Sequence, residues 1–197
     1  MKLFFDWVLF QLQKDILNCF EISELEGNLM TIAIVTQLRF AREEFKRCLF
    51  GVDYPEGLIR FKPMNSISWI IGHLANQEHN HWVINAQGEN IAPDLNARVG
   101  YGKPASTPEM QEMCALWKNV TNKADTYLDT LEEEMLDNHL QIIPGKLHYE
   151  SIGKTLLRVC YHYWFHTGEA YAIRQQLGHE NLPDFVGNMD GVLYSER

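Results

Sequence analysis

The sequence predicts an all-α protein built as a four-helix bundle, with an extra N-terminal helix and a short hairpin or extended loop before the last core helix. Four long segments repeat apolar residues at three- and four-residue steps, which is the period of an amphipathic helix. Connections rich in Gly, Pro and polar residues separate these segments, and a strand signal occurs only around residues 140–149. A chain of 197 residues with 46% hydrophobic content is long enough for one packed core.

Residues 1–29 are predicted to form a helical extension, and residues 30–197 the bundle domain. The apolar opening is interrupted at Asp6 and continues into polar residues without a small-residue cleavage site, so we expect an amphipathic helix rather than a signal peptide. No stretch approaches the roughly 20 apolar residues that cross a bilayer. We therefore expect a soluble protein without a membrane partner.

The first two core helices are predicted over residues 31–50 and from Asn65 or Ser66 to about Gln87. Either Asn65 or Ser66 can cap the second helix, and Gly88 can stop it. Its predicted apolar face contains Ile67, Ile70, Ile71, Leu74 and Ile84. Residues 88–106 are predicted to be an exposed loop long enough to cover the mouth of a site.

The third helix is predicted to begin at the Ser106–Glu109 cap and to run to about Met135. Pro144 and Gly145 suit a tight turn between two short apolar runs, which predicts the hairpin. The last core helix is predicted from a Ser151 cap to Gly178.

Charge and cysteine content exclude several classes of function. The net charge is -9, and no run of basic residues occurs that could attract a phosphate backbone, so we expect no nucleic-acid partner. The four cysteines are far apart and form no C-x-x-C pair, which fits reduced thiols in a cytoplasm.

The candidate site begins with His162 and His166, which are four residues apart in the last helix. This spacing places the two rings about 40° apart around the helix and roughly 6 Å apart along it, near the apolar stripe. One metal ion can satisfy both imidazoles, although hydrogen bonds to backbone or side chains can do so as well.

A third ligand is expected from the second helix. His73 lies near the middle of that helix, at the edge of its apolar face, where it can meet the pair and leave coordination positions open. His81 is the alternative ligand, and one ion cannot use both because they lie about 12 Å apart along the axis. His79 is expected at the surface, and His139, His148 and His179 in exposed connections.

Glu169 shares the face of His162 and His166. It can act as a fourth ligand, as a hydrogen-bond acceptor behind a ligand, as a general base, or as a plain polar residue on the helix flank.

The middle of the last helix is apolar on nearly every side, because it contains Tyr161, Tyr163, Trp164 and Phe165. We therefore expect a homodimer, with coverage by residues 1–20 as the alternative.

Two blocks of the sequence resemble the DinB/YfiT-like superfamily. The first is Ser66–Ala75, SISWIIGHLA, followed by Glu78, and the second is HYWFHTGE, residues 162–169, followed by IRQQLG, residues 173–178. The resemblance covers roughly residues 31–180. It implies an up-down-down-up four-helix bundle, a metal held by His73, His162 and His166, commonly zinc or nickel, and often a dimer. Characterised members include thiol-dependent S-transferases and isomerases that use low-molecular-weight thiols. The segment 1–29 is not part of the family pattern.

These observations favour a divalent-metal-dependent enzyme that activates a thiol or a water for a small-molecule substrate. Thiol S-transfer and hydrolysis both fit, and the thiol cosubstrate rests on the resemblance alone. The alternatives are a non-catalytic metal-binding or sensor bundle, which predicts a saturated coordination shell, and a structural bundle with merely hydrogen-bonded histidines. A ferritin-like di-iron site is set aside because it needs a Glu-x-x-His pair on each of two helices, and the core helices contain only one, Glu78 with His81.

Overall fold

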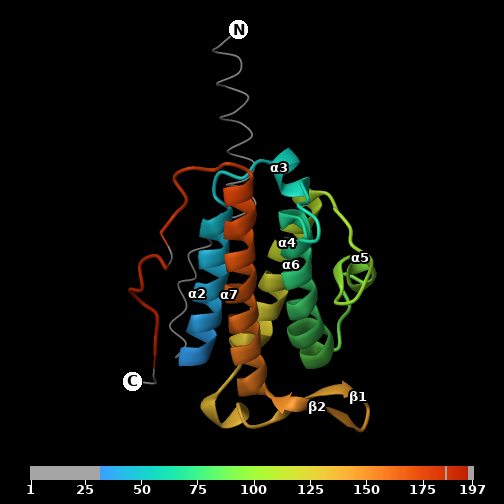
Figure 1. Ribbon diagram of the computed structural model, residues 1–197. Coiled ribbons are helices and arrows are strands. Elements are labelled where there is room, and N and C mark those ends of the chain that lie inside the picture. The colour runs from blue at the N-terminus through green and yellow to red at the C-terminus, as the bar shows by residue number, and fades with distance from the viewer. Residues whose placement is uncertain (1–31, 185, 195–197) are drawn as a thin grey trace.

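The computed structural model describes residues 32–184 and 186–194, and this part of the chain is mostly helical (Figure 1). The predicted extension, residues 1–29, lies outside the described residues. The elements follow in the order α2 (Ala33–Leu49), α3 (Tyr54–Leu58), α4 (Ile67–Glu78), the π-helix η1 (His79–Asn85), α5 (Leu95–Val99), α6 (Met110–Leu128), the 3-10 helix η2 (Glu133–Met135), β1 (His139–Ile143), β2 (Lys146–Ser151) and α7 (Ile152–Gln176). The all-α class is therefore confirmed, with one small sheet.

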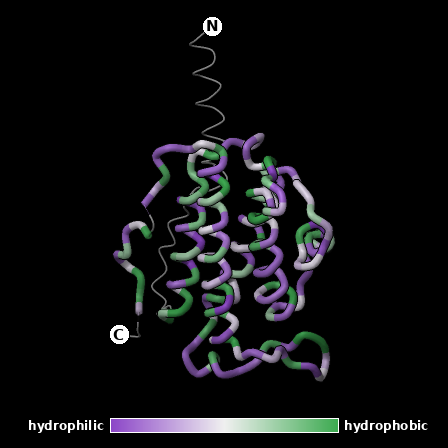
Figure 2. Tube along the Cα trace, viewed as in Figure 1, coloured by the Kyte–Doolittle hydropathy of each residue, from purple (hydrophilic) through white to green (hydrophobic). Residues whose placement is uncertain are grey.

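The long helices lie side by side around one apolar core. The most extensive contacts join α4 to α6 and α2 to α7, and α4 also contacts α7. Hydrophobic and hydrophilic residues alternate along each long helix, as Figure 2 shows, so that each helix can turn an apolar stripe inward. Fully buried core residues include Leu38, Phe45, Ile70, Leu74, Met113, Val120, Leu156, Val159 and Tyr163.

A buried polar network crosses this core and links the four long helices. Arg42 on α2 donates to both carboxylate oxygens of Glu78 at the end of α4, and to Asp125 on α6 at 2.8 Å. Tyr163 on α7 donates to Glu78 at 2.6 Å and accepts from the indole N–H of Trp117 at 2.7 Å. Because Glu78 has 0% and Arg42 4% relative exposure, each of these side chains depends on the others for its hydrogen bonds.

Two of the predicted helix starts are confirmed. Ser66 accepts a hydrogen bond from the backbone N–H of Trp69, and Ser151 accepts one from that of Lys154. The predicted cap at Ser106–Glu109 is wrong, since the third helix begins only at Met110 and has no side-chain cap. The Ser106 hydroxyl instead donates to the carbonyl of Arg98 at 2.8 Å, which ties the preceding loop to α5.

The second helix continues as a π-helix, and this changes which residues face the core. A π-helix bonds each N–H to the carbonyl five residues earlier, so that each turn holds more residues than an α-helical turn. Trp82 and Val83 are consequently fully buried, whereas Ile84, predicted on the apolar face, is only partly buried. The predicted exposed loop 88–106 is also partly wrong, because it contains α5, whose Leu95 and Val99 are buried.

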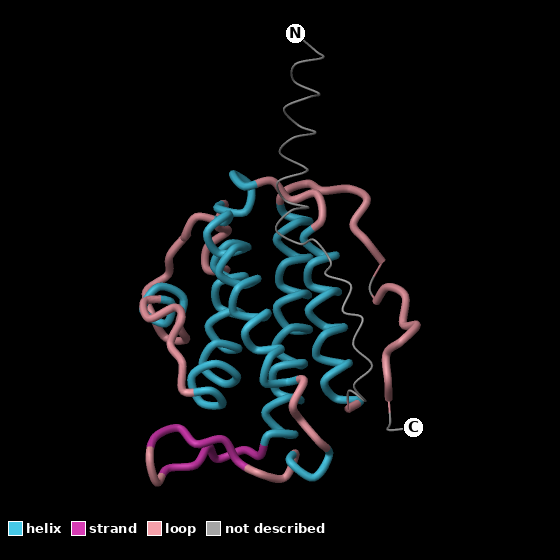
Figure 3. Tube along the Cα trace, turned by 180° about the vertical axis from the view of Figure 1, so that it is seen from behind, coloured by secondary structure: helices cyan, strands magenta, loops and turns pink. Residues whose placement is uncertain are grey.

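The hairpin is confirmed and lies at one end of the helices, as the view from behind shows (Figure 3). β1 and β2 pair antiparallel, with His139 opposite Ser151 and Gln141 opposite Leu147. The turn contains Gly145 at φ +80°, a conformation that L side chains rarely adopt. Because β2 ends where α7 begins, the hairpin adjoins the N-terminal end of the helix that carries two of the candidate ligands.

Within residues 32–184 and 186–194, none of the helices combines the length and the apolar character needed to cross a lipid bilayer.

Candidate metal centre

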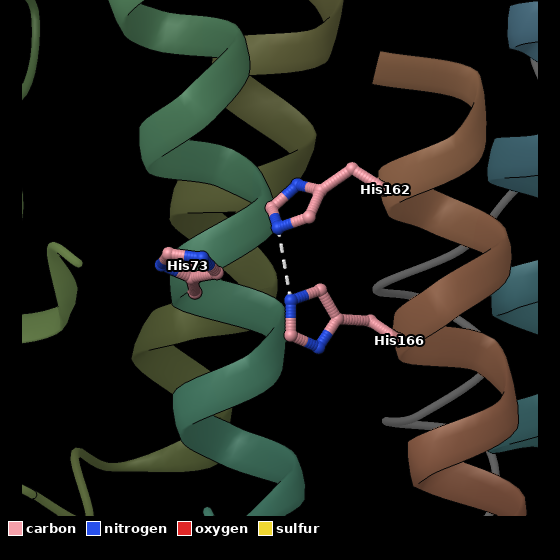
Figure 4. Close-up of side chains that lie close together, drawn as sticks. All are labelled: His73, His162 and His166. Carbon is pink, nitrogen blue, oxygen red and sulfur yellow. Dashed lines mark hydrogen bonds between the residues drawn. The ribbon is translucent and has the colours of Figure 1, made fainter. Parts of the chain in front are cut away.

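Three imidazoles from two helices meet in the interior of the fold. His73 extends from α4, and His162 and His166 extend from α7 toward it (Figure 4). One nitrogen from each ring can be chosen so that all three lie within 4.8 Å of one another. The Nε2 atoms of His162 and His166 are 2.9 Å apart. The structure thus brings together the three histidines that the sequence predicted.

The secondary structure explains why these rings converge. His162 and His166 are separated by about one turn of an uninterrupted α-helix, so their side chains lie on one face. His73 is two turns into α4, which starts at the Ser66 cap. His73 is held against Trp69, whose ring stacks on it at a centroid distance of 4.4 Å and an interplanar angle of 15°.

The second nitrogen of each ring is already occupied by a hydrogen bond. The Nδ1–H of His73 donates to the carbonyl of Val99 at 2.8 Å, and that of His166 donates to the carboxylate of Glu169 at 2.8 Å. The Nδ1 of His162 lies 2.5 Å from Oε1 of Gln77. Carbonyl and carboxylate oxygens can only accept, so these partners assign the proton of each neutral ring to Nδ1. The Nε2 atom of each ring then carries a lone pair, which is directed toward the other two histidines.

This donor set fits a divalent metal ion. Two neutral imidazoles of this tautomer present lone pairs to each other across 2.9 Å, which is unfavourable without a proton or a cation between them. Metal-binding histidines commonly donate their second N–H to a carbonyl or carboxylate, as these do. Three nitrogen ligands with open positions are typical of catalytic rather than structural zinc sites.

The electrostatics keep the rings ready to bind a cation. Burial lowers the pKa of His73, and the neighbouring His166 lowers it further. Burial, together with His166 and His73, lowers the pKa of His162 to about 3. A neutral ring is the form that binds a metal, so protons compete little with a metal at His73 and His162 near neutral pH.

Glu169 and His81, the two other predicted site residues, occupy different places. Glu169 lies behind His166 as a hydrogen-bond acceptor, with its side chain 18% exposed. His81, on η1, lies beside His148 with ring centroids 5.3 Å apart and perpendicular, outside the three-histidine cluster. The structure therefore brings His73, rather than His81, together with the pair on α7.

Two of the histidines predicted at the surface are buried. His79 is 2% exposed and its Nε2 accepts from the backbone N–H of Ile91 at 3.2 Å. His148 is 8% exposed, because its position on β2 places it against η1 rather than in an open loop. Both predictions were wrong because they treated each segment alone: the chain at Ile91 covers His79, and η1 covers His148.

Two pockets adjoin the cluster and share Gln77 and His162 in their walls. The larger, about 610 Å³, is otherwise lined by Glu150, Lys154, Leu157, Arg158, Tyr161 and Phe165. The smaller, about 340 Å³, is otherwise lined by His73, Asn76, Asn80, Asn96 and Tyr101. Both pockets therefore reach His162, and the smaller one also reaches His73.

Sequence reasoning missed Gln77 and the Val99 carbonyl, which orient His162 and His73. Gln77 follows His73 by four residues, so helical spacing placed it on the same face. The Val99 carbonyl had no comparable signal, because it depends on how α5 folds back onto α4.

Comparison with known proteins identifies one family. The model described as the DinB superfamily matches residues 37–170, which includes all three histidines and Glu169. No curated protein matches the chain significantly.

Proposed function

The chain belongs to the DinB superfamily, and on that premise we propose that it is a divalent-metal-dependent enzyme whose ion is held by His73, His162 and His166. We propose the family's up-down-down-up four-helix bundle as its topology, formed by α2, α4 with η1, α6 and α7. The observation that carries the functional proposal is the meeting of three ring nitrogens within 4.8 Å.

Zinc or nickel is the proposed ion, since both accept imidazole ligands. When bound, such an ion lowers the pKa of a coordinated water or thiol toward neutrality and so supplies a nucleophile. The chain's own part is to hold three neutral imidazoles at fixed positions. Each ring is held in place by an oxygen atom that contacts its Nδ1, and these oxygens belong to Val99, Gln77 and Glu169.

Glu169 is proposed as a positioning residue that acts through His166. Its carboxylate accepts the Nδ1–H of that ring, which fixes the tautomer and increases the electron density at Nε2. The contact supports this role over that of a fourth ligand, since a carboxylate oxygen occupied by Nδ1–H lies on the far side of the ring from Nε2.

The two adjoining pockets favour an enzyme over a storage or sensor protein. A sensor was expected to fill the coordination shell with Glu169 or His81, and neither belongs to the group of close ligand atoms among the described residues. Pockets of about 610 and 340 Å³ leave room for a small-molecule substrate and, by analogy with the family, a low-molecular-weight thiol. Thiol S-transfer and hydrolysis are both compatible with this arrangement.

We also propose a homodimer located in the cytoplasm. Tyr161 and Phe165 on α7 are 66% and 68% exposed, which supports contact with a second copy across the mouth of the larger pocket, while the pocket itself stays open to a small molecule. Cys48, Cys114 and Cys160 are buried and form no disulfide among the described residues, which suits a reducing compartment. Light scattering during size-exclusion chromatography tests the dimer directly.

Elemental analysis of protein purified without a His tag tests the proposed function. We expect about one zinc or nickel ion per chain, and its loss in His73→Ala, His162→Ala and His166→Ala. The matched control is His81→Ala, which removes the alternative ligand and should retain the ion. Unchanged metal in the first three variants, or loss in the control, would overturn the assignment. Activity is then screened with and without a thiol cosubstrate.

A further inference from the structure

The larger pocket beside His162 contains one positive charge without a partner. Arg158 and Glu150 form a bidentate ion pair, in which Nε of Arg158 lies 2.6 Å from Oε2 of Glu150, so their charges cancel. Lys154 also lines the pocket, its side chain is exposed, and no acidic group among the described residues pairs with it. The side chains of this pocket therefore carry a net positive charge, in a chain whose net charge is -9.

One wall of the larger pocket consists of apolar side chains that are exposed to solvent. Leu157, Tyr161 and Phe165 follow one another at four-residue steps on α7, and they are 38%, 66% and 68% exposed. Large apolar side chains in a row at the surface are typical of a place where a ligand or partner lies. The row runs alongside His162 and His166 on the same helix.

The cation and the metal centre lie at opposite ends of this wall. Eight residues separate Lys154 from His162, which is about 12 Å along an α-helix. The smaller pocket differs in character, because it is lined by the amides Asn76, Gln77, Asn80 and Asn96 and contains no Lys or Arg. Apart from a metal ion held by the histidines, an anionic group therefore finds an unpaired cationic side chain only in the larger pocket, at the end remote from the histidines.

We propose that the larger pocket binds a small organic acid, with its carboxylate on the Lys154 ammonium and its apolar body along Leu157, Tyr161 and Phe165. The opposite end of the molecule then points toward His162. Lys154 is the specificity-determining residue, because the overall negative field of the protein would otherwise repel an acid. The proposal rests on the proposed function only for the chemistry at the His162 end.

A matched pair of probes tests this. Calorimetry measures the affinity of 4-phenylbutyrate and of the neutral 4-phenylbutan-1-ol for wild type, Lys154→Gln, Lys154→Arg and the distant Lys62→Gln. A charge-assisted contact should make the acid-to-alcohol affinity ratio about five- to tenfold larger in wild type than in Lys154→Gln. Lys154→Arg and Lys62→Gln should retain the wild-type ratio.

Each titration is repeated after removal of the metal with a chelator, because a carboxylate can also bind a metal ion. We expect the acid preference to persist in metal-free protein and to disappear with Lys154→Gln. A preference that survives Lys154→Gln, or that vanishes only with the metal, would overturn the proposal. Absence of metal from the wild type would instead refute the proposed function, while leaving the acid preference measurable.

Discussion

Replacing Glu169 tests whether the hydrogen bond behind His166 tunes metal binding. Glu169→Ala removes the carboxylate that accepts the Nδ1–H, whereas Glu169→Gln keeps an acceptor and removes only its charge. The contact is 2.8 Å long, and the two side chains are 6% and 18% exposed, so water screens it little. Neither substitution alters the three proposed ligands themselves.

The magnitude follows from the kind of hydrogen bond that is lost. A hydrogen bond with a charged partner contributes about 1.5–3 kcal/mol, and one between neutral groups about 0.5–1.5 kcal/mol. If this energy is expressed in metal binding, Glu169→Ala should weaken zinc affinity by about 10- to 100-fold, as is typical for partners of metal-bound histidines. Glu169→Gln should lose about 1 kcal/mol, or roughly fivefold in affinity.

Competition with a chromogenic zinc chelator measures these affinities, and thermal melts of the metal-free proteins check that the fold is retained. Glu133→Gln, which removes the same charge from an exposed site far along the chain, serves as the control and should bind zinc as wild type does. Zinc affinity in Glu169→Ala equal to that of wild type would refute the reasoning. Equal losses in the Ala and Gln variants would refute the part assigned to the charge.

The buried Arg42–Glu78 pair, His81 and the metal centre each affect the stability of the fold in a measurable way. Arg42→Met should lower the free energy of unfolding by about 3–5 kcal/mol in urea titrations, since it leaves Glu78 buried without its cation; a loss below 1 kcal/mol would contradict this. Burial and His148 lower the pKa of His81 to about 4, so the metal-free protein should lose up to about 1.4 kcal/mol per pH unit from this group as the pH falls from about 6.5 to about 4. His81→Leu should flatten that slope, and an unchanged slope would show that His81 does not cause it. Chelation of the metal should lower the melting temperature of wild type and leave that of His162→Ala unchanged, as differential scanning calorimetry can measure.

The fold and the histidine cluster were predictable because both depend on helical periodicity. The apolar stripes of the four long segments identified the core, and the spacing of His162 and His166 placed two rings on one face. The choice of His73 over His81 followed from its place near the middle of its helix and from the family resemblance. All of these signals lie within single segments of the chain.

What sequence reasoning missed depends on departures from regular helix and on contacts between distant segments. The π-helix at His79–Asn85 changed the phase of the residues that follow, so Trp82 is buried and Ile84 is only partly buried. His79 is buried because the chain at Ile91 lies against its ring. The carbonyl of Val99 and the burial of His148 arise where α5 and the hairpin fold back onto the second helix. A periodicity analysis that treats each segment separately contains no information on such contacts.

The Arg42–Glu78–Tyr163 network also has a consequence for the aim of the histidines. Apolar contacts are non-directional, whereas the hydrogen bonds of a buried ion pair keep good geometry over only a narrow range of helix rotation. Tyr163 immediately follows His162 on α7, and Glu78 immediately follows Gln77 on α4. The same bonds that fix Tyr163 and Glu78 therefore set the rotation of α4 and α7 about their own axes. The residues that line the pockets can then vary while the three imidazoles keep their orientation toward one another.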